Sequence, residues 1–561
     1  MNYIDIIKQV FSFLGGLGLF LYGMHVMSVG LQKAAGNKMK QLLAALTKNK
    51  FFGVLVGTLV TSIIQSSSAT TVMVVGFVNA GLMNLTQSVG IIMGANIGTT
   101  VTAWLVASAE WLQFFNPVFL APLAVAVGAG FLLFASKDRT KHIGEIIVGF
   151  GVLFVGMSTM SNVLSIYRDS EVFRNVFITL GRNPLLGLLA GTVVTGIIQS
   201  SSASVAILQS VAMSGFVPFG AAVYIIMGQN IGTCVTAILS SIGASRNAKA
   251  ASYIHLIFNI LGSIIFTVIA VVYFKIFNTV IAELPISATQ ISIIHSMFNI
   301  INTVLLYHFS NQLIALAKRL AWGKVQETEE ISAVHLDERI LDTPYFAIQN
   351  TVKEIVRLGD MVNVSLKLAA ETLADRDTSK IQTILTREED VDTLTRLIAS
   401  YLVKLSSREL NEQESTMVTS LINIINNIER VGDHCENMAE LAQFYIDENV
   451  ILSDTAHGEL KQVMDATLIC YEAAIKAFEQ NDVKAAESVA KLEDEVDRLE
   501  ALYREAHIDR LKAGVCTPTG GVFLLDALTN LERIGDHALN ISEYVIDENA
   551  KYNKHKRYVN A

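Results

Sequence analysis

The sequence predicts an all-α protein with a polytopic membrane half followed by a soluble helical half. Residues 1–325 carry 18 Lys and Arg against 7 Asp and Glu, a net charge of +11, whereas the remainder carries 24 against 44, a net charge of −20. Gly53–Val106 and Asn183–Gly243 contain no charged side chain. Segments without charge are typical of membrane-spanning helices, because a charged side chain in the middle of the bilayer costs at least ~2.5 kcal/mol.

Several stretches are apolar enough to span a bilayer, which needs roughly 20 such residues. They lie near 10–31, 85–107, 114–135, 143–163, 218–242, 250–274 and 288–317. We therefore expect a multi-pass protein of the cell (inner) membrane, in contact with the lipid bilayer. Lys and Arg cluster near 318–324, at the end of the last stretch, and positive charge favours the cytoplasmic side. The soluble half is accordingly predicted to be cytoplasmic.

An internal repeat occupies the membrane half. GTLVTSIIQSSSATTV at 57–72 matches GTVVTGIIQSSSASVA at 191–206, and IIMGANIGTTVTAWL at 91–105 matches IIMGQNIGTCVTAIL at 225–239, both at an offset of 134 residues. Duplicated transporters often hold their substrate between the copies, and we expect the copies to be inverted. The predicted domains are membrane repeat 1 (1–142), membrane repeat 2 with an extra helix (143–317), a linker (318–341), a helical domain (342–549) and a basic polar tail (550–561).

The polar cluster Gln-Ser-Ser-Ser interrupts an apolar stretch in each copy, at Gln65–Ser68 and Gln199–Ser202. Four consecutive helical residues face all directions, so one helix face cannot hide them from lipid. We expect a broken or reentrant helix whose free N–H groups and hydroxyls bind an anion. Serine is also a common packing residue between membrane helices, but the equal spacing of two copies favours binding.

A second duplicated block contains the sequence Asn-Ile-Gly-Thr. Asn96 and Thr99 in the first copy, and Asn230 and Thr233 in the second, offer the hard oxygen ligands that suit Na⁺. The flanking glycines could instead serve close helix packing. Ala95 stands where the second copy has Gln229, so the two halves are not expected to work equally.

Basic residues are absent around both duplicated blocks. No Lys or Arg lies between Lys50 and Lys137, or between Arg182 and Arg246. A permanent Arg clamp would bind a tetrahedral oxyanion tightly, and co-bound Na⁺ could supply charge that leaves with the anion. This absence favours ion coupling.

A smaller pattern also recurs, as His255-x-x-Phe-Asn259 and His295-x-x-Phe-Asn299. His and Asn four residues apart share a helix face. Hydrogen bonding between helices is the simpler interpretation, and a role in the permeation path is the alternative.

The doubled QSSSA and doubled NIGT blocks resemble the sodium–phosphate cotransporter family over about 15–315. The resemblance implies sodium-driven symport of phosphate through inverted repeats with two reentrant hairpins. It implies phosphate binding by the serines Ser66, Ser67, Ser68, Ser200, Ser201 and Ser202. It implies sodium binding around Gln65, Gln199, Gln229, Thr233 and Thr236, with Asn96 and Thr99 in the first copy, although Ala95 puts a matching first-copy site in doubt.

The soluble half is also doubled and helical by pattern. Glu429–Asn437 reads ERVGDHCEN, and Glu532–Asn540 reads ERIGDHALN. An earlier acidic helix accompanies each copy. Together they give four ExxxD pairs with both carboxylates on one helix face: Glu388/Asp392, Glu429/Asp433, Glu493/Asp497 and Glu532/Asp536. Such groups could bind a divalent or ferric ion, and a single pair would more simply be a solvated face.

The doubled ERxGDHxxN motif resembles the PhoU family over about 345–547. The resemblance implies a tandem pair of three-helix bundles, acidic metal-binding motifs and a regulatory role in phosphate signalling. Both halves therefore indicate phosphate independently.

Three functions remain open: a sodium–phosphate cotransporter, a phosphate exporter of the same fold, and a non-transporting phosphate sensor. No ATP-binding motif is present, and the serines lack a recognisable His and Asp partner spacing. We therefore expect secondary transport, no enzymatic activity and no nucleic-acid partner. The residue pattern alone leaves sulfate or another small oxyanion, the direction of transport and homo-oligomerisation open.

Overall fold

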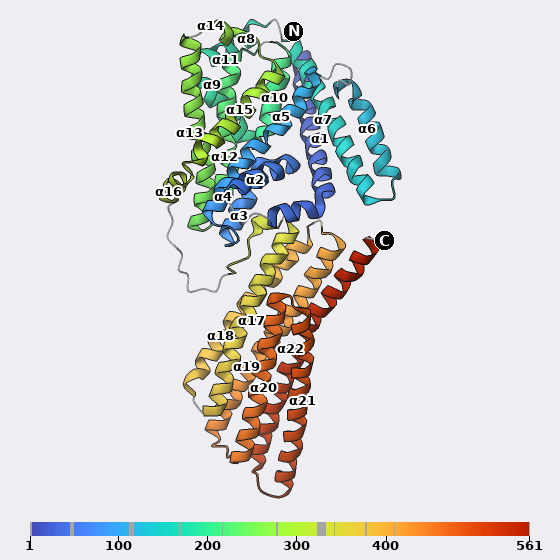
Figure 1. Cartoon of the computed structure of the whole chain (residues 1–561), viewed down its shortest axis with the longest axis vertical. Coiled ribbons are helices and arrows are strands. Elements are labelled where there is room, and N and C mark those ends of the chain that lie inside the picture. Colours follow the sequence, from blue (N-terminus) through green and yellow to red (C-terminus); the bar gives the residue numbers. More distant parts are fainter. Residues whose placement is uncertain are drawn as a thin grey trace. The chain divides into compact units, whose positions relative to one another are not determined.

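The computed structural model describes residues 3–44, 50–111, 117–167, 170–215, 217–276, 279–321, 333–341, 343–375, 378–408 and 410–559. It divides into two compact units, Met1–Val325 and Gln326–Ala561 (Figure 1). The division falls inside the predicted linker 318–341, of which 322–332 lie outside the described residues. The predicted tail 550–561 begins within the last helix, and its final two residues lie outside the described part.

The first unit is helical wherever the structure describes it, apart from turns and an isolated bridge between Pro218 and Pro285. Its helices are α1 (Tyr3–Ala44), α2 (Lys50–Ile64), α3 (Ser67–Asn79), α4 (Leu85–Gly98), α5 (Thr100–Trp111), α6 (Pro117–Phe134), α7 (Asp138–Ser165), α8 (Glu171–Arg182), α9 (Pro184–Ile198), α10 (Ser201–Met213), α11 (Phe219–Gly232), α12 (Cys234–Ser240), α13 (Arg246–Ile276), α14 (Thr279–Glu283), α15 (Ala288–Tyr307) and α16 (Ser310–Leu320).

Six segments of the described part are long and apolar enough to cross a membrane, or up to seven if a bent pair counts as one span. They are Tyr3–Ala34, Leu85–Glu110, Asp138–Ser165, Phe219–Ser240, Arg246–Ile276 and Ala288–Tyr307, and the bent pair is Asn175–Arg182 with Pro184–Ile198. The chain is therefore a multi-pass membrane protein by length and composition.

Two predicted spans differ in the structure. The stretch predicted at 288–317 is interrupted at His308 and Phe309, after which α16 begins. The candidate span therefore ends at Tyr307, and α16 is a separate short helix with Lys318 and Arg319 in its last turn. The stretch predicted at 114–135 forms α6, whose described apolar part is shorter than the six spans.

The sequence repeat is also a structural repeat, because α2 to α5 and α9 to α12 follow in the same order at the same offset. Helix α2 packs against α4, and α9 packs against α11. A Cβ atom added at Gly94 would lie 2.0 Å from the carbonyl oxygen of Val54, and one at Gly228 would lie 1.9 Å from that of Leu188. Close packing by the glycines of this block is therefore confirmed.

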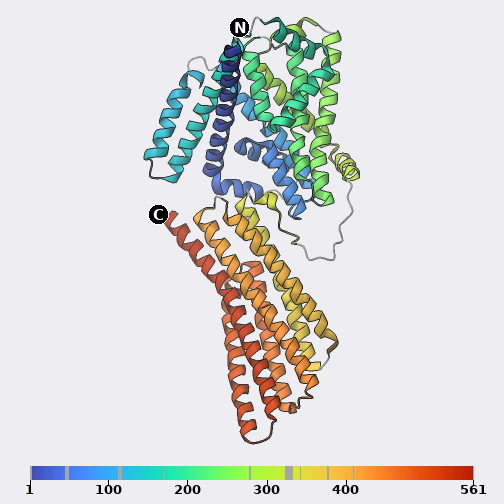
Figure 2. The same ribbon diagram turned by 180° about the vertical axis from the view of Figure 1, so that it is seen from behind.

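The repeats are flanked by further helices. Helix α1 packs along α7, and α6 packs against α7, on the opposite side of the unit from α9, α11 and α13 (Figures 1 and 2). Gly23 and Gly149 allow α1 and α7 to approach, since a Cβ atom at either position would lie 2.3 Å from a backbone nitrogen of the other helix.

In the described part of the second unit, six long helices lie side by side, besides two short 3₁₀ turns (Figure 2). They are α17 (Pro344–Asp375), α18 (Ile381–Ser406), α19 (Glu412–Asp447), α20 (Asp454–Gln480), α21 (Val483–Lys512) and α22 (Pro518–Val559). Helices α17, α18 and α19 pack on one another, as do α20, α21 and α22, and α19 meets α22 where the two bundles join. The expected tandem pair of three-helix bundles is confirmed.

We expect Gly94→Ala to destabilise the membrane unit by about 1–3 kcal/mol or more, because overpacking forces two helix backbones apart. Thermal unfolding of the full chain in detergent measures the loss. Gly130→Ala is the matched control, because no atom lies within 4 Å of a Cβ atom added there, and it should leave the transition unchanged or raise it. Equal stability of the two variants would contradict the packing argument.

Candidate functional site

The first break in the membrane unit separates α2 from α3. Gln65 has a φ of 58°, in the left-handed region that ends a helix and that L-residues seldom adopt. Ser66 is the N-cap of α3, and its side-chain oxygen accepts a hydrogen bond from the Ala69 N–H at 3.1 Å. Ser67 and Ser68 follow in the first turn and are buried. The break therefore places two buried hydroxyls at the N-terminus of a helix.

The second break repeats this geometry between α9 and α10. Gln199 has a φ of 57°, and Ser200 caps α10 by accepting from the Ala203 N–H at 3.3 Å. Ser201 and Ser202 are buried in the first turn. The predicted interruption of the apolar stretch is therefore confirmed in both copies.

The two breaks meet. The hydroxyl oxygens of Ser67 and Ser201, which are 134 residues apart in sequence, lie 3.5 Å from each other. The hydroxyl of Ser68 donates to the carbonyl oxygen of Gln199 at 3.4 Å. Two helix N-termini and their serines therefore converge on one buried place. Free backbone N–H groups and hydroxyls at helix N-termini are suited to an anion.

The Asn-Ile-Gly-Thr block of the first repeat contacts the serines of the second break. The Thr99 hydroxyl lies 3.2 Å from that of Ser202 and 3.4 Å from that of Ser201. Thr102 lies beside it and donates to the Gln65 side-chain oxygen at 2.7 Å. Thr102 was missed from the sequence, although its counterpart at the repeat offset, Thr236, was included. The offset of 134 residues was the signal that could have identified it.

In the matching block of the second repeat, fewer of the polar side-chain atoms in the described part of the chain form hydrogen bonds. Gln229 donates to the carbonyl and hydroxyl oxygens of Ser204, at 3.0 and 2.9 Å. Within the residues that the structure describes, its own side-chain oxygen is buried without a hydrogen-bond partner, as are the hydroxyls of Thr233 and Thr236. Oxygens of this kind are of the type that binds a cation. The first and second repeats therefore differ in how far their polar atoms are already paired.

The two asparagines of these blocks are buried and similarly held. Asn96 donates to the Ile92 carbonyl at 2.7 Å, and Asn230 donates to the Ile226 carbonyl at 2.8 Å. Each amide nitrogen donates to a carbonyl of its own helix, and the Asn96 side-chain oxygen accepts a hydrogen bond from Asn259.

The repeated His-x-x-Phe-Asn pattern has a mixed outcome. Asn259 donates to the side-chain oxygen of Asn96 at 3.2 Å, so its hydrogen bonding between helices is confirmed. His255 and His295 are buried, and their ring nitrogens have no partner in the described part of the chain.

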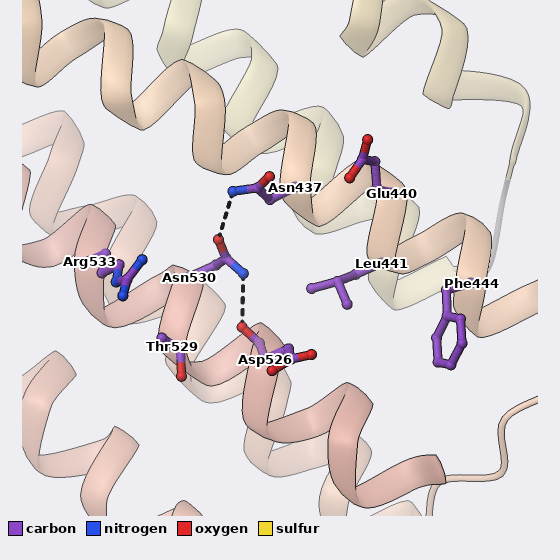
Figure 3. A pocket seen from close by; sticks show the side chains of 8 residues that line it. All are labelled: Asn437, Glu440, Leu441, Phe444, Asp526, Thr529, Asn530 and Arg533. Atoms are coloured by element: carbon purple, nitrogen blue, oxygen red, sulfur yellow. Dashed lines mark hydrogen bonds between the residues drawn. The ribbon is translucent and has the colours of Figure 1, made fainter.

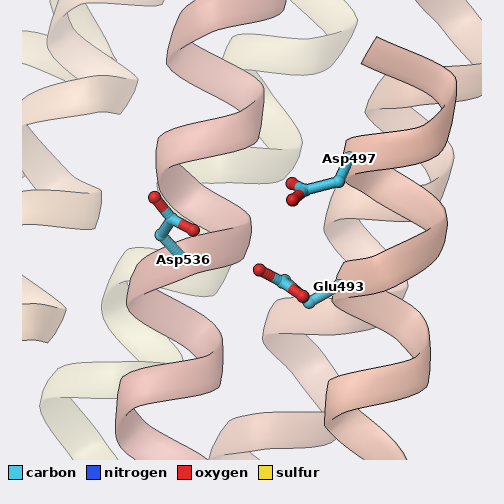
Figure 4. Close-up of side chains that lie close together, drawn as sticks. All are labelled: Glu493, Asp497 and Asp536. Carbon is cyan, nitrogen blue, oxygen red and sulfur yellow. The ribbon is translucent and has the colours of Figure 1, made fainter. Parts of the chain in front are cut away.

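An acidic cluster in the second unit is formed by Glu493, Asp497 and Asp536. One carboxylate oxygen from each lies within 4.8 Å of the others, and α21 and α22 hold them face to face (Figure 4). Burial, followed by repulsion from Asp497 and Asp536, raises the pKa of Glu493 to about 7. The pKa of Asp497 is also raised by burial and by Asp536. The pKa of Glu532 is raised mainly by burial and further by repulsion from Asp536 and Asp497.

The corresponding acids of the first bundle also influence one another. Burial and then Asp392 raise the pKa of Glu388 to about 7. The pKa values of Glu429 and Asp433 are raised by burial first and by neighbouring carboxylates second. The described residues bring only the trio of the second bundle within the distance that one ion spans.

A symmetric contact joins the two bundles. His434 Nδ1 lies 2.8 Å from the Asn530 side-chain oxygen, and His537 Nδ1 lies 2.9 Å from that of Asn427. Both asparagines donate their amide N–H to their own helix, so their oxygens accept and each His Nδ1 donates. The rings stack with centroids 5.8 Å apart. Burial lowers the pKa of both histidines, that of His537 to about 4.

A cavity of 470 Å³ adjoins this contact. Helix α19 contributes one wall and α22 the other (Figure 3). Its lining residues are Asn437, Glu440, Leu441, Phe444, Asp526, Thr529, Asn530 and Arg533. Asn437 donates to the Asn530 side-chain oxygen at 3.3 Å, so the cavity and the symmetric contact share residues.

These features define a multi-pass membrane protein whose duplicated helix breaks converge on one polar site, joined to a tandem helical-bundle unit. The chain belongs to the Na⁺/Pi-cotransporter family, whose model matches residues 19–162 and 168–305. The PhoU domain model matches residues 355–442 and 460–545. The chain is thus a member of a phosphate-transport family with a PhoU region.

Curated relatives match most of this chain or about half of it. A protein of Salmonella typhimurium, provisionally named inorganic phosphate export protein YjbB, is 24% identical over 500 residues, covering 89% of this chain and 90% of the relative. The uncharacterized protein YqeW of Bacillus subtilis is 30% identical over 317 residues, covering 56% of this chain and 98% of the relative. Among solved structures, PhoU from Pseudomonas aeruginosa is 24% identical and covers 36% of this chain and 97% of its own, with a TM-score of 0.34.

Proposed function

We propose that this chain is a secondary active transporter that couples sodium to the movement of inorganic phosphate across the cell (inner) membrane. The observation that carries the proposal is the convergence of two capped helix N-termini, with Ser67 and Ser201 3.5 Å apart, inside a unit of the Na⁺/Pi-cotransporter family. In this proposal the PhoU-like unit is cytoplasmic and regulates transport.

The proposed phosphate site uses neutral donors. The buried hydroxyls of Ser67, Ser68, Ser201 and Ser202 surround the place where α3 and α10 begin. Ser66 and Ser200 accept from the backbone as N-caps, which leaves their hydroxyl hydrogens to donate to an anion. Charge-assisted bonds from such donors bind a tetrahedral oxyanion without an Arg clamp.

The proposed sodium ligands are the oxygens around both Asn-Ile-Gly-Thr blocks. The second repeat has the stronger support, because Gln229, Thr233 and Thr236 each carry a buried oxygen without a partner. Asn230 and Gln199 complete that set in the proposal. In the first repeat, the proposed ligands Gln65 and Thr99 already hydrogen-bond to neighbours, and Asn96 adds its side-chain oxygen.

Sodium and phosphate depend on each other in this arrangement. A cluster of neutral dipoles in a low-dielectric site holds a bare anion weakly, and a nearby cation lowers that cost. Since the cation leaves with the anion, it assists binding without trapping the substrate. Coupling is then a mutual increase in affinity between two ligands.

In the second unit we propose that Glu493, Asp497 and Asp536 bind a divalent or ferric cation, with Glu532 beside them. The supporting observations are the separation of at most 4.8 Å between carboxylate oxygens and the raised pKa of Glu493. Three crowded carboxylates repel one another until a cation or a proton intervenes. Glu388, Asp392, Glu429 and Asp433 are the proposed equivalent site of the first bundle.

We expect Ser67→Ala combined with Ser201→Ala to abolish most phosphate transport. The half-saturating phosphate concentration should rise at least about tenfold, because two donors to a charged group are lost. The measurement is uptake of labelled phosphate into vesicles under an inward sodium gradient. Ser108→Ala is the control, because in the described part of the chain that hydroxyl donates to the Leu105 carbonyl of its own helix and to no other group. Normal transport by the double variant would contradict the site assignment.

We expect metal binding at the cluster of the second bundle to require Asp497 and Asp536 and to weaken as pH falls. The pKa of Glu493 is raised to about 7, so protons compete with the metal below about that pH and the carboxylates bind it more tightly above it. Metal content of the purified full chain, measured by mass spectrometry near pH 8 and pH 5.5, tests this. Glu487→Ala, an exposed acid on α21 outside the cluster, should keep the metal that Asp497→Ala loses.

Export is the second candidate function, because a relative matched over 89% of this chain is provisionally named a phosphate exporter. Vesicles loaded with labelled phosphate and given outward and inward sodium gradients separate the two directions. Uptake should dominate under physiological gradients if coupling is to sodium entry. Efflux that is independent of sodium would favour export, and no flux in any ion gradient would contradict transport.

A further inference from the structure

Asn259 on α13 lies where the two repeats meet. It is fully buried, and its amide N–H groups face three acceptors. They donate to the Asn96 side-chain oxygen of the first repeat at 3.2 Å and to Cys234 Sγ of the second repeat at 3.3 Å. The third acceptor is the carbonyl of His255 at 3.0 Å. One side chain therefore contacts both Asn-Ile-Gly-Thr blocks, although it belongs to neither.

These contacts determine how Asn96 is oriented. The Asn96 amide nitrogen donates to the Ile92 carbonyl, and its oxygen accepts from Asn259, so both ends of the amide are held. Three acceptors on one side also fix which end of the Asn259 amide faces them. Its oxygen then points to the other side, where it is buried without a partner.

We propose that Asn259 is a positioning residue for ion coupling, which holds the Asn96 oxygen in place for sodium and links the two Asn-Ile-Gly-Thr blocks. This inference rests on the proposed sodium-coupled function. Partners that orient a metal ligand by hydrogen bonding act without touching the substrate. Sodium binding in the first repeat is thereby linked to Cys234, the neighbour of Thr233 in the second repeat.

The chain contains a matched control for this role. Asn299 lies in the same His-x-x-Phe-Asn pattern on α15, is equally buried and also has a side-chain oxygen without a partner. Its amide nitrogen donates only to the His295 carbonyl of its own helix, at 2.9 Å. Replacing Asn299 therefore removes a similar buried amide but keeps the hydrogen bond from Asn259 to the Asn96 side-chain oxygen.

The test measures phosphate transport by the full chain in vesicles as a function of sodium concentration. Asn259→Ala should raise the sodium concentration for half-maximal transport by about tenfold, as loss of an orienting partner commonly does, while the maximal rate at saturating sodium is largely kept. Asn299→Ala should leave that concentration within about twofold of the wild type. If Asn259 acts through Asn96, the double variant Asn96→Ala/Asn259→Ala should be no worse than Asn96→Ala alone.

Several results would overturn the inference. One is an unchanged sodium dependence in Asn259→Ala, and another is an equal shift of the half-maximal sodium concentration in Asn299→Ala. A third is a double variant whose shift in that concentration is the product of the Asn96→Ala and Asn259→Ala shifts. Should Asn259→Ala fail to fold, Asn259→Ser, which keeps a hydroxyl donor on the same helix face, should show a smaller shift in the same direction, and no shift would count against the proposal. Wild-type transport without any response to sodium would instead contradict the proposed function.

Discussion

The absence of water in the hydrocarbon core constrains the whole membrane unit. A helix that breaks at mid-membrane frees backbone N–H groups that must find partners inside the protein. Here Ser66 and Ser200 satisfy part of that demand as N-caps. The remaining donors of one break face those of the other, since Ser67 and Ser201 lie in contact. The duplicated breaks therefore place their free polar groups against each other, and the same contact forms a buried polar site.

The two repeats have the same backbone conformation, but their corresponding side chains differ in whether they form hydrogen bonds. Gln65 and Gln199 adopt the same left-handed conformation within one degree of φ, and the glycines of α4 and α11 approach α2 and α9 equally closely. Thr99 nevertheless hydrogen-bonds to the serines, whereas the Thr233 hydroxyl has no partner among the described residues. The two copies therefore have equal backbones but differently paired side chains.

Much of this organisation follows from local sequence. The charge-free stretches, the repeat offset and the polar interruptions at Gln65 and Gln199 are properties of neighbouring residues, so they were predictable. The contact of Asn259 with both blocks was not, because it depends on how distant helices cross. The bend of 112° between α8 and α9 was also missed, although Asn183 and Pro184 are a capping pair. The sodium and phosphate ligands stay predictions.

Charge connects the two halves of the sequence. The membrane half has a net charge of +11 and lacks charge around its site, whereas the remainder has a net charge of −20. Phosphate is repelled by so acidic a surface unless a cation is bound first. The carboxylates of Glu493, Asp497 and Asp536 lie close enough to share one. A PhoU-like unit that responds to phosphate would therefore depend on its metal, just as the proposed membrane site would depend on sodium. In both places the proposed cation would take the role of a permanent basic side chain.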